Sequence, residues 1–111
     1  MAVLDMDAEL FRRWTSGDKP VLVEFWAPWC VYCRRIGPAL EKIAGEREET
    51  LVTGRVNIDD EEPLSDAEQI DVVPTLVVYR GGRRLGSIVA PGSKAQIERF
   101  LSDTLTAPAQ E

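Results

Sequence analysis

The sequence contains no histidine and only two cysteines among its 111 residues. Without histidine, the chain has no Ser-His or Cys-His catalytic pair and no histidine-bearing metal site. Two cysteines cannot complete a four-cysteine site, so a zinc ion or an iron–sulfur cluster would need a second copy of the chain. The sequence therefore predicts no metal site within one chain.

Long apolar runs and an excess of basic residues are also missing. No segment approaches the roughly 20 apolar residues that span a bilayer, and the first ten residues carry three acids and no base, unlike a secretory signal. The net charge is −6, from 13 basic against 19 acidic residues, which disfavours nucleic acid because phosphate binding needs clustered cations. We therefore expect a cytoplasmic protein that binds neither membranes nor nucleic acid. We also expect a monomer, although none of these observations addresses the oligomeric state.

What is present indicates one folded domain. The length suits a single domain, and a composition of 44% apolar and 29% charged residues is typical of a globular protein. There is no internal repeat and no linker. We assign residues 1–105 to one domain and residues 106–111 to a flexible polar tail.

Hydrophobic periodicity predicts strands that alternate with helices. The expected strands are Ala2–Leu4, Val21–Trp26, Leu51–Ile58, Thr75–Arg80 and Arg83–Val89, and the expected helices are Asp7–Ser16, Cys30–Glu48, Pro63–Gln69 and Ser93–Leu105. Pro38 predicts a kink or a break in the second helix. The order β-α-β-α-β-α-β-β-α predicts an α/β fold with a central mixed sheet flanked by helices.

The strongest chemical signal is the segment WAPWCVYC, which lies between a buried strand and a long helix. At a helix N-terminus, unpaired N–H groups and the macrodipole favour a cysteine thiolate. We expect Cys30 to attack disulfides and Cys33, one turn further on, to resolve the mixed disulfide. Half of a zinc site, or two inert buried cysteines, are the alternatives.

The stretch VLVEFWAPWCVYC resembles the active-site segment of the thioredoxin family. The motifs VNID and VPT and the GG turn follow at that family's spacings, and the resemblance covers roughly Leu4–Leu105. It implies the thioredoxin fold, a redox-active disulfide between Cys30 and Cys33, and no bound cofactor. It also implies a shuttle that receives electrons from NADPH through a thioredoxin reductase-like flavoprotein and reduces disulfides in client proteins.

The resemblance also implies a client-binding groove. The family carries a cis proline beside the disulfide, here Pro74, and a cis bond would turn the backbone groups of Val73 toward an extended client. A trans proline that merely opens a strand is the alternative. Trp29 is expected in the docking surface, and Ala90, in a loop where the family has a glycine, is expected to touch the client.

Glu24 is an acid within an otherwise apolar strand. Burial would raise its pKa, and the carboxylate could then accept the proton of Cys33. The family usually has aspartate here, and Arg55 stands where the family has a lysine that pairs with this acid. An arginine could hold Glu24 ionised, so the sequence leaves open which effect prevails, or whether Glu24 reaches solvent at the strand end.

Val31 and Tyr32 replace the Gly-Pro pair of typical thioredoxins. We expect the Tyr32 N–H to point at the Cys30 sulfur and stabilise the reduced form, and Trp26 to pack beneath the site. The Cys-x-Tyr-Cys pattern is similar to that of glutaredoxins. Two alternatives therefore stay open: a glutaredoxin-like or more oxidising enzyme, and a redox-silent thioredoxin-fold binding module.

Overall fold

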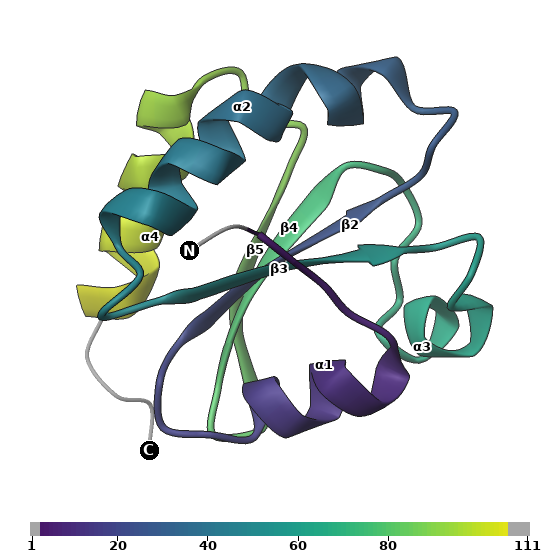
Figure 1. The fold of residues 1–111 in the computed structure, drawn as a ribbon, viewed down its shortest axis with the longest axis horizontal. Coiled ribbons are helices and arrows are strands. Elements are labelled where there is room, and N and C mark those ends of the chain that lie inside the picture. Colours follow the sequence, from purple (N-terminus) through teal and green to yellow (C-terminus); the bar gives the residue numbers. More distant parts are fainter. Residues whose placement is uncertain (1–2, 107–111) are drawn as a thin grey trace.

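The computed structural model places five strands in one mixed sheet, with helices on both faces (Figure 1). It describes residues 3–106. The strands are β1 (Leu4–Asp5), β2 (Val21–Trp26), β3 (Val52–Asn57), β4 (Thr75–Arg80) and β5 (Arg83–Val89), and the helices are α1 (Ala8–Thr15), α2 (Val31–Glu46), α3 (Glu62–Ala67) and α4 (Lys94–Thr106). The predicted order of elements and fold class are confirmed.

The strand β2 lies at the centre of the sheet, whose order is β1-β3-β2-β4-β5. It pairs with β3 in parallel and with β4 in antiparallel orientation, and β4 pairs with β5 in a hairpin. The hairpin turn uses Gly81 and Gly82 at φ values of 60° and 77°, a left-handed conformation that glycine adopts without strain. Because β2 has neighbours on both sides, the segment that follows its carboxyl end lies at the middle of that edge of the sheet.

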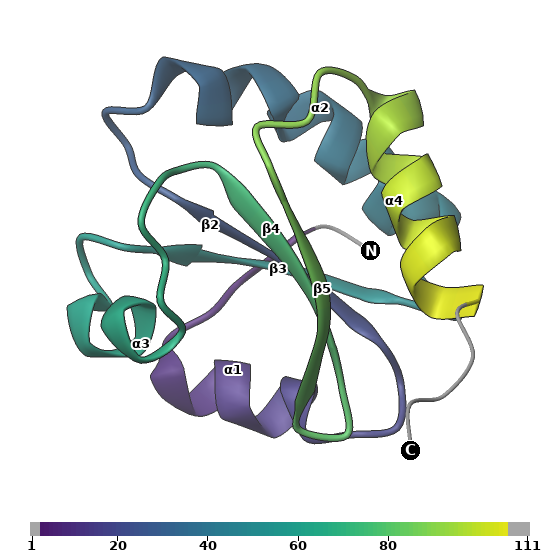
Figure 2. The same cartoon turned by 180° about the vertical axis from the view of Figure 1, so that it is seen from behind.

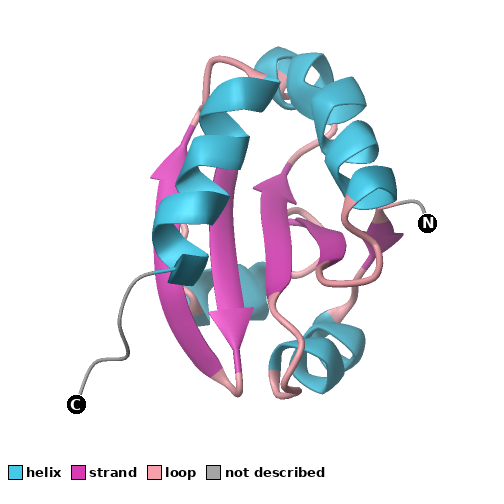
Figure 3. Cartoon of the chain, turned by 90° about the vertical axis from the view of Figure 1, so that its left-hand side faces the viewer, coloured by secondary structure: helices cyan, strands magenta, loops and turns pink. Residues whose placement is uncertain are grey.

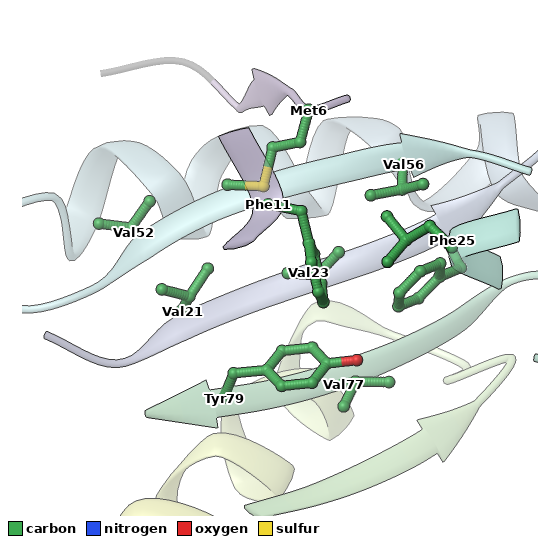
Figure 4. Close-up of a cluster of buried hydrophobic side chains, with 10 residues drawn as sticks. Met6, Phe11, Val21, Val23, Phe25, Val52, Val56, Val77 and Tyr79 are labelled. Carbon is green, nitrogen blue, oxygen red and sulfur yellow. The ribbon is translucent and has the colours of Figure 1, made fainter. Parts of the chain in front are cut away.

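One face of the sheet packs against α1 and α3, and the other packs against α2 and α4 (Figures 1, 2 and 3). On the α1/α3 face, the Phe11 ring lies edge-on to the rings of Phe25 and Tyr79, at centroid distances of 6.1 and 5.0 Å (Figure 4). Gly54 lets Met6 lie against β3, because a Cβ at this glycine would come within 2.7 Å of the Met6 sulfur. The core on this face is therefore the one that contains buried aromatic rings.

The α2/α4 face is aliphatic and is built around Leu22 of β2. Its other fully or almost fully buried members are Ile36, Leu40, Ile43, Leu51, Leu76, Val78, Ile97 and Leu101. The helix α2 continues through Pro38 from Val31 to Glu46, so the predicted break does not occur. Pro38 is exposed on this helix and its ring meets solvent rather than the core.

The chain ends differ from the predicted boundaries. The first strand lies at Leu4–Asp5 rather than Ala2–Leu4, and Ala2 is outside the described residues. Thr106 belongs to α4, where its hydroxyl donates to the carbonyl of Ser102 at 2.6 Å. The rest of the predicted tail, residues 107–111, lies outside the described part of the chain.

Candidate active site

Cys30 and Cys33 form a disulfide where the chain passes from β2 into α2. Cys30 is the N-cap residue of α2, with extended backbone angles, and its Sγ accepts the N–H of Cys33 at 3.1 Å. A sulfur in this position replaces the side-chain oxygen that usually caps a helix. It therefore lies where unpaired N–H groups and the helix dipole stabilise negative charge.

Both sulfur-bearing residues are buried, with 6% of Cys30 and 3% of Cys33 exposed. They form a small cluster with Ala27, and the half-buried residues around this cluster are Trp26, Tyr32, Ile58 and Val73. Trp26 thus packs against the disulfide cluster, as the sequence predicted.

The Tyr32 amide does not occupy the position that the sequence predicted. The donor to Sγ of Cys30 is the amide of Cys33, the third residue of α2. This follows from N-cap geometry, in which the cap side chain turns toward the second or third amide of the first turn. The structure therefore gives no support to a Tyr32 N–H that stabilises the reduced form.

The peptide bond between Val73 and Pro74 is cis, and the trans alternative is wrong. Val73 contacts the disulfide cluster from the segment just before β4. The Ala90 N–H donates to the carbonyl of Pro74 at 2.9 Å, which brings the loop after β5 to the same place. Three predicted client-binding residues, Val73, Pro74 and Ala90, are therefore neighbours although they come from two segments.

Trp29 is the most exposed large apolar side chain near the disulfide, at 64%. Its Nε1 donates to Oδ2 of Asp59 at 3.1 Å, which joins the indole to the segment after β3. Val31 of the same segment is also exposed, as are Val72 and Val89 in the segments that hold the cis-proline and its partner loop. Exposed apolar side chains thus flank both of these segments.

Glu24 is buried, with 2% of the residue exposed, so it does not reach solvent at the strand end. Its Oε2 accepts no hydrogen bond from any described residue. Burial raises the pKa of Glu24 to about 7, and the positive charge of Arg55 only partly opposes this shift. Glu24 shares a strand face with Leu22, which packs against α2. The carboxyl therefore lies between β2 and the helix that carries Cys33.

Arg55 makes its ion pair with Asp5, whose Oδ1 lies 2.7 Å from Nε. Its guanidinium also lies over the Trp26 ring, 4.9 Å from the centroid. The parallel register aligns Asp5, Arg55 and Glu24 in one row across β1, β3 and β2. The charge of Arg55 lowers the pKa of Glu24, but burial has the larger effect, so the pKa stays raised at about 7 and the carboxyl is only partly ionised at neutral pH.

Three residues of the site were missed in the sequence. Asp59 orients Trp29, Asp5 binds Arg55, and the carbonyl of Pro91 accepts the Tyr32 hydroxyl at 2.9 Å. The position of Asp59 could have been predicted from the sequence. Asp59 follows β3, and the segment with Trp29 follows β2, the parallel neighbour of β3. The carboxyl ends of parallel neighbours lie at the same edge of the sheet. The other two contacts depend on strand register and loop conformation, which composition does not reveal.

The described part of the chain offers no cluster of three or more metal-ligating side chains of the His, Cys, Asp and Glu types. Between residues 3 and 106, no helix is long and apolar enough to cross a membrane. Disulfide exchange is the chemistry that a capped Cys-x-x-Cys pair supports, because the thiolate is both nucleophile and leaving group. Fold and site together define a thiol-disulfide oxidoreductase.

Comparison with known proteins agrees with this assignment. The family model "Thioredoxin" matches residues 2–103. A thioredoxin of Alicyclobacillus acidocaldarius subsp. acidocaldarius is 36% identical over 95 residues, which cover 86% of this chain and 90% of that protein. A solved thioredoxin structure from Malassezia sympodialis superposes with a TM-score of 0.84 at 26% identity, covering 93% of this chain and 90% of that one.

A third relative is a bifunctional thioredoxin reductase/thioredoxin of Mycobacterium leprae. It is 36% identical over 99 residues, which make up 89% of this chain but only 22% of that longer protein. The chain belongs to the thioredoxin family. The predicted family, fold and class of enzyme activity are therefore confirmed.

Proposed function

We propose that the protein reduces disulfides in client proteins by dithiol exchange through Cys30 and Cys33. The observation that carries this proposal is the capping geometry, in which Sγ of Cys30 receives the N–H of Cys33 at 3.1 Å at the positive end of a 16-residue helix. A donor aimed at the sulfur lowers the pKa of the thiol and favours the attacking thiolate at neutral pH.

The exchange transfers two electrons in two steps. The Cys30 thiolate attacks one sulfur of the client disulfide, which forms a mixed disulfide and releases the other client sulfur as a thiolate. The Cys33 thiolate then attacks Sγ of Cys30, which releases the second client sulfur and forms the Cys30–Cys33 disulfide. The client disulfide is reduced to two thiols and the protein is oxidised to its disulfide.

Glu24 accepts the proton of Cys33 before the second step. A buried carboxyl with a pKa near 7 is partly ionised at neutral pH and is matched to such a transfer. Its place between β2 and α2 supports this role. Arg55 is a positioning residue that acts on Glu24 through charge, and its guanidinium lies over the ring of Trp26, which packs against the disulfide cluster.

The client lies along the groove beside the cis-proline. An extended segment pairs with the backbone of Val73, as in strand addition, and touches the neighbouring residues Pro74 and Ala90. Trp29 and Val31, both exposed, contact the client next to the attacking sulfur. Exposed aromatic anchors of this kind commonly carry binding energy.

The electrons come from NADPH through a thioredoxin reductase-like flavoprotein. The name of the Mycobacterium leprae relative, which joins a thioredoxin reductase to a thioredoxin, supports this partner. The protein acts as a monomer in the cytoplasm, with the disulfide as its only redox centre. A reducing compartment suits this activity, because disulfides there are catalytic rather than structural.

Insulin reduction tests the proposal and distinguishes the second candidate, a glutaredoxin-like enzyme suggested by Tyr32. The protein is assayed with thioredoxin reductase and NADPH in one arm, and with glutathione, glutathione reductase and NADPH in the other. We expect turnover in the first arm to exceed that in the second at least about tenfold. Faster turnover with glutathione would favour the second candidate, and activity in neither arm nor with dithiothreitol would contradict protein-disulfide reduction.

A further inference from the structure

The hydroxyl of Tyr32 has no part in the chemistry described so far, yet it makes a long-range contact. It donates to the carbonyl of Pro91 at 2.9 Å, although the two residues are 59 positions apart in the sequence. Tyr32 lies between the two cysteines in the first turn of α2, and its half-buried ring packs against both the disulfide cluster and the aliphatic core. It thus connects the redox helix directly to the segment after β5.

That segment, residues 90–92, passes beside α2 on its way from β5 to α4 (Figure 2). It is held at three points. The Ala90 N–H donates to the Pro74 carbonyl at 2.9 Å, the Pro91 carbonyl accepts from Tyr32, and the Gly92 N–H donates to the side chain of Gln96. Each of its three residues is therefore attached to a different element of the fold.

The conformation of the segment shows that these attachments are needed. Ala90 has a φ of 46°, a left-handed value that costs an L-residue roughly 1–2 kcal/mol. Such a conformation persists only where the surroundings impose it. Pro91 is buried, so without the Tyr32 hydroxyl its carbonyl would lose its partner in a place with little access to water. Tyr32 supplies one of the contacts that impose the loop conformation.

We propose that Tyr32 is a positioning residue for client selection, whose hydroxyl holds residues 90–92 at the spacing from Val73 and Cys30 that an extended protein segment requires. The inference rests on the proposed reduction of protein disulfides. A client segment that pairs with the Val73 backbone passes the loop at residues 90–92, because the Ala90 N–H joins this loop to the Pro74 carbonyl. The position of the loop therefore decides how the segment fits beside Cys30. A small disulfide reaches Cys30 without contacting the loop and is insensitive to its position.

The test compares Tyr32→Phe with Tyr79→Phe. Tyr79 is the other tyrosine of the chain, and its hydroxyl donates to Glu68 at 2.6 Å on the opposite face of the sheet. Each variant loses one hydroxyl hydrogen bond and keeps its ring. For both variants and the wild type, kcat and KM are measured with insulin and with 5,5′-dithiobis(2-nitrobenzoate), using thioredoxin reductase and NADPH as the electron source and subtracting the rate without the protein. Hydrogen exchange of the Ala90 and Gly92 amides is followed in parallel.

We expect the ratio of kcat/KM for insulin to kcat/KM for the small disulfide to fall about three- to tenfold in Tyr32→Phe, the range set by one hydrogen bond. The loss lies mainly in KM for insulin, the two amides exchange faster, and Tyr79→Phe changes neither. Gln96→Ala, at an exposed position, releases the neighbouring attachment and is expected to lower the same ratio, which tests the loop even if Tyr32→Phe folds poorly.

An unchanged ratio in both Tyr32→Phe and Gln96→Ala would overturn the inference. An equal fall in kcat/KM for both substrates would also overturn it, because the hydroxyl would then act on the redox pair and not on client fit. A wild type that reduced the small disulfide but not insulin would contradict the proposed function instead. In that case, amide exchange as slow in Tyr32→Phe as in the wild type would separately contradict the positioning role.

Discussion

Buried polar groups are hydrogen-bonded in one region of the molecule and unpartnered in another. The first region is the core between the sheet and helices α1 and α3, and the second surrounds the disulfide. In the first, the hydroxyls of Thr15, Ser65 and Tyr79 all donate hydrogen bonds, at 2.8, 2.9 and 2.6 Å. In the second, neither Oε2 of Glu24 nor Nε1 of Trp26 finds a partner among the described side chains and backbone. Both regions are closely packed, so the difference does not come from loose structure.

The difference indicates which region stabilises the protein and which performs its chemistry. Buried polar groups without partners cost free energy, and proteins keep them mainly where function requires them. An acid with a satisfied carboxylate would have a low pKa and would be a poor proton acceptor near neutral pH. The cost of burying Glu24 and the usefulness of Glu24 therefore have the same physical origin.

The largest contrast is expected from the cysteines themselves. Cys30→Ser should reduce insulin turnover to the uncatalysed background, because it removes the attacking thiolate, with little change in the stability of the reduced protein. Cys33→Ser should also stop turnover but accumulate mixed disulfides with clients, which non-reducing gels would detect. Brief iodoacetamide treatment of the reduced wild type should label Cys30 first, and preferential labelling of Cys33 would reverse the assigned roles.

A substitution in the aromatic core should show the opposite behaviour. Phe11→Ala removes the ring that contacts Phe25 and Tyr79 and should lower the free energy of unfolding by about 3–5 kcal/mol. Chemical denaturation measures this loss. Insulin turnover per folded molecule should stay within about twofold of the wild type, because Phe11 lies across the sheet from the disulfide. A large loss of turnover in the folded protein would show that the two regions are not separate.

Glu24→Gln should stabilise the oxidised protein while slowing the enzyme. The folded-state pKa of about 7 exceeds the unfolded value near 4.5, so the folded protein binds more protons between these values and wild-type stability falls as pH rises through this range. Above about pH 7 the full cost is present, on the order of 3 kcal/mol. The variant should exceed the wild type by about this amount at pH 8, with the difference approaching zero by about pH 4.

The same substitution tests the catalytic role of the acid. Turnover should fall about tenfold to a hundredfold, while the alkylation rate of Cys30 changes little, because the first attack does not use Glu24. In the wild type, turnover should rise with pH through about 7 as the carboxyl ionises, and the variant should lose this step. Equal turnover of the two proteins at neutral pH would remove Glu24 from the proton transfer.

The smallest effect is expected at Ala90, where the active-site region holds an L-residue in a left-handed conformation. Ala90→Gly removes a steric cost of roughly 1–2 kcal/mol from the folded state. It also makes the unfolded chain more flexible, which lowers the free energy of unfolding by about 0.4–1 kcal/mol. We expect a net gain of about 0.5 kcal/mol by urea denaturation. A loss of more than about 1 kcal/mol would show that the alanine methyl group makes a contact that outweighs the backbone strain.

The sequence predicted most of the fold because its signals are local. The strands β2, β4 and β5 were predicted to the residue, since apolar runs and the Gly81–Gly82 turn mark their ends. The pattern Ser-x-x-Gln at residues 93–96 predicts a capping box at the start of α4, and the Ser93 hydroxyl accepts the Gln96 N–H at 3.1 Å. Gln96 completes only half of the expected box, because its side chain accepts the N–H of Gly92 instead.

The electrostatics of the site could not be predicted in the same way. Whether Arg55 or burial controls the pKa of Glu24 depends on how far the fold buries the carboxyl, and burial has the larger effect. Asp5 binds Arg55 because β1 pairs with β3 in the register that places the two residues side by side. The role of Tyr32 was misplaced for two reasons. Its backbone N–H was chosen as the donor to Cys30, although the cap sulfur accepts the Cys33 N–H instead. The acceptor of its hydroxyl, the Pro91 carbonyl, lies 59 positions away in the sequence and depends on loop conformation.

The most direct test of the account is the titration of the Glu24 carboxyl in the oxidised wild type. Carbon-13 NMR of glutamate-labelled protein, with Glu24→Gln to assign the resonance, follows ionisation of this one group. We expect a midpoint near pH 7, because burial raises the pKa of Glu24 to about 7 despite the charge of Arg55. A midpoint near 4.5, the ordinary value for glutamate, would show that Glu24 is solvated or fully paired and would contradict the account.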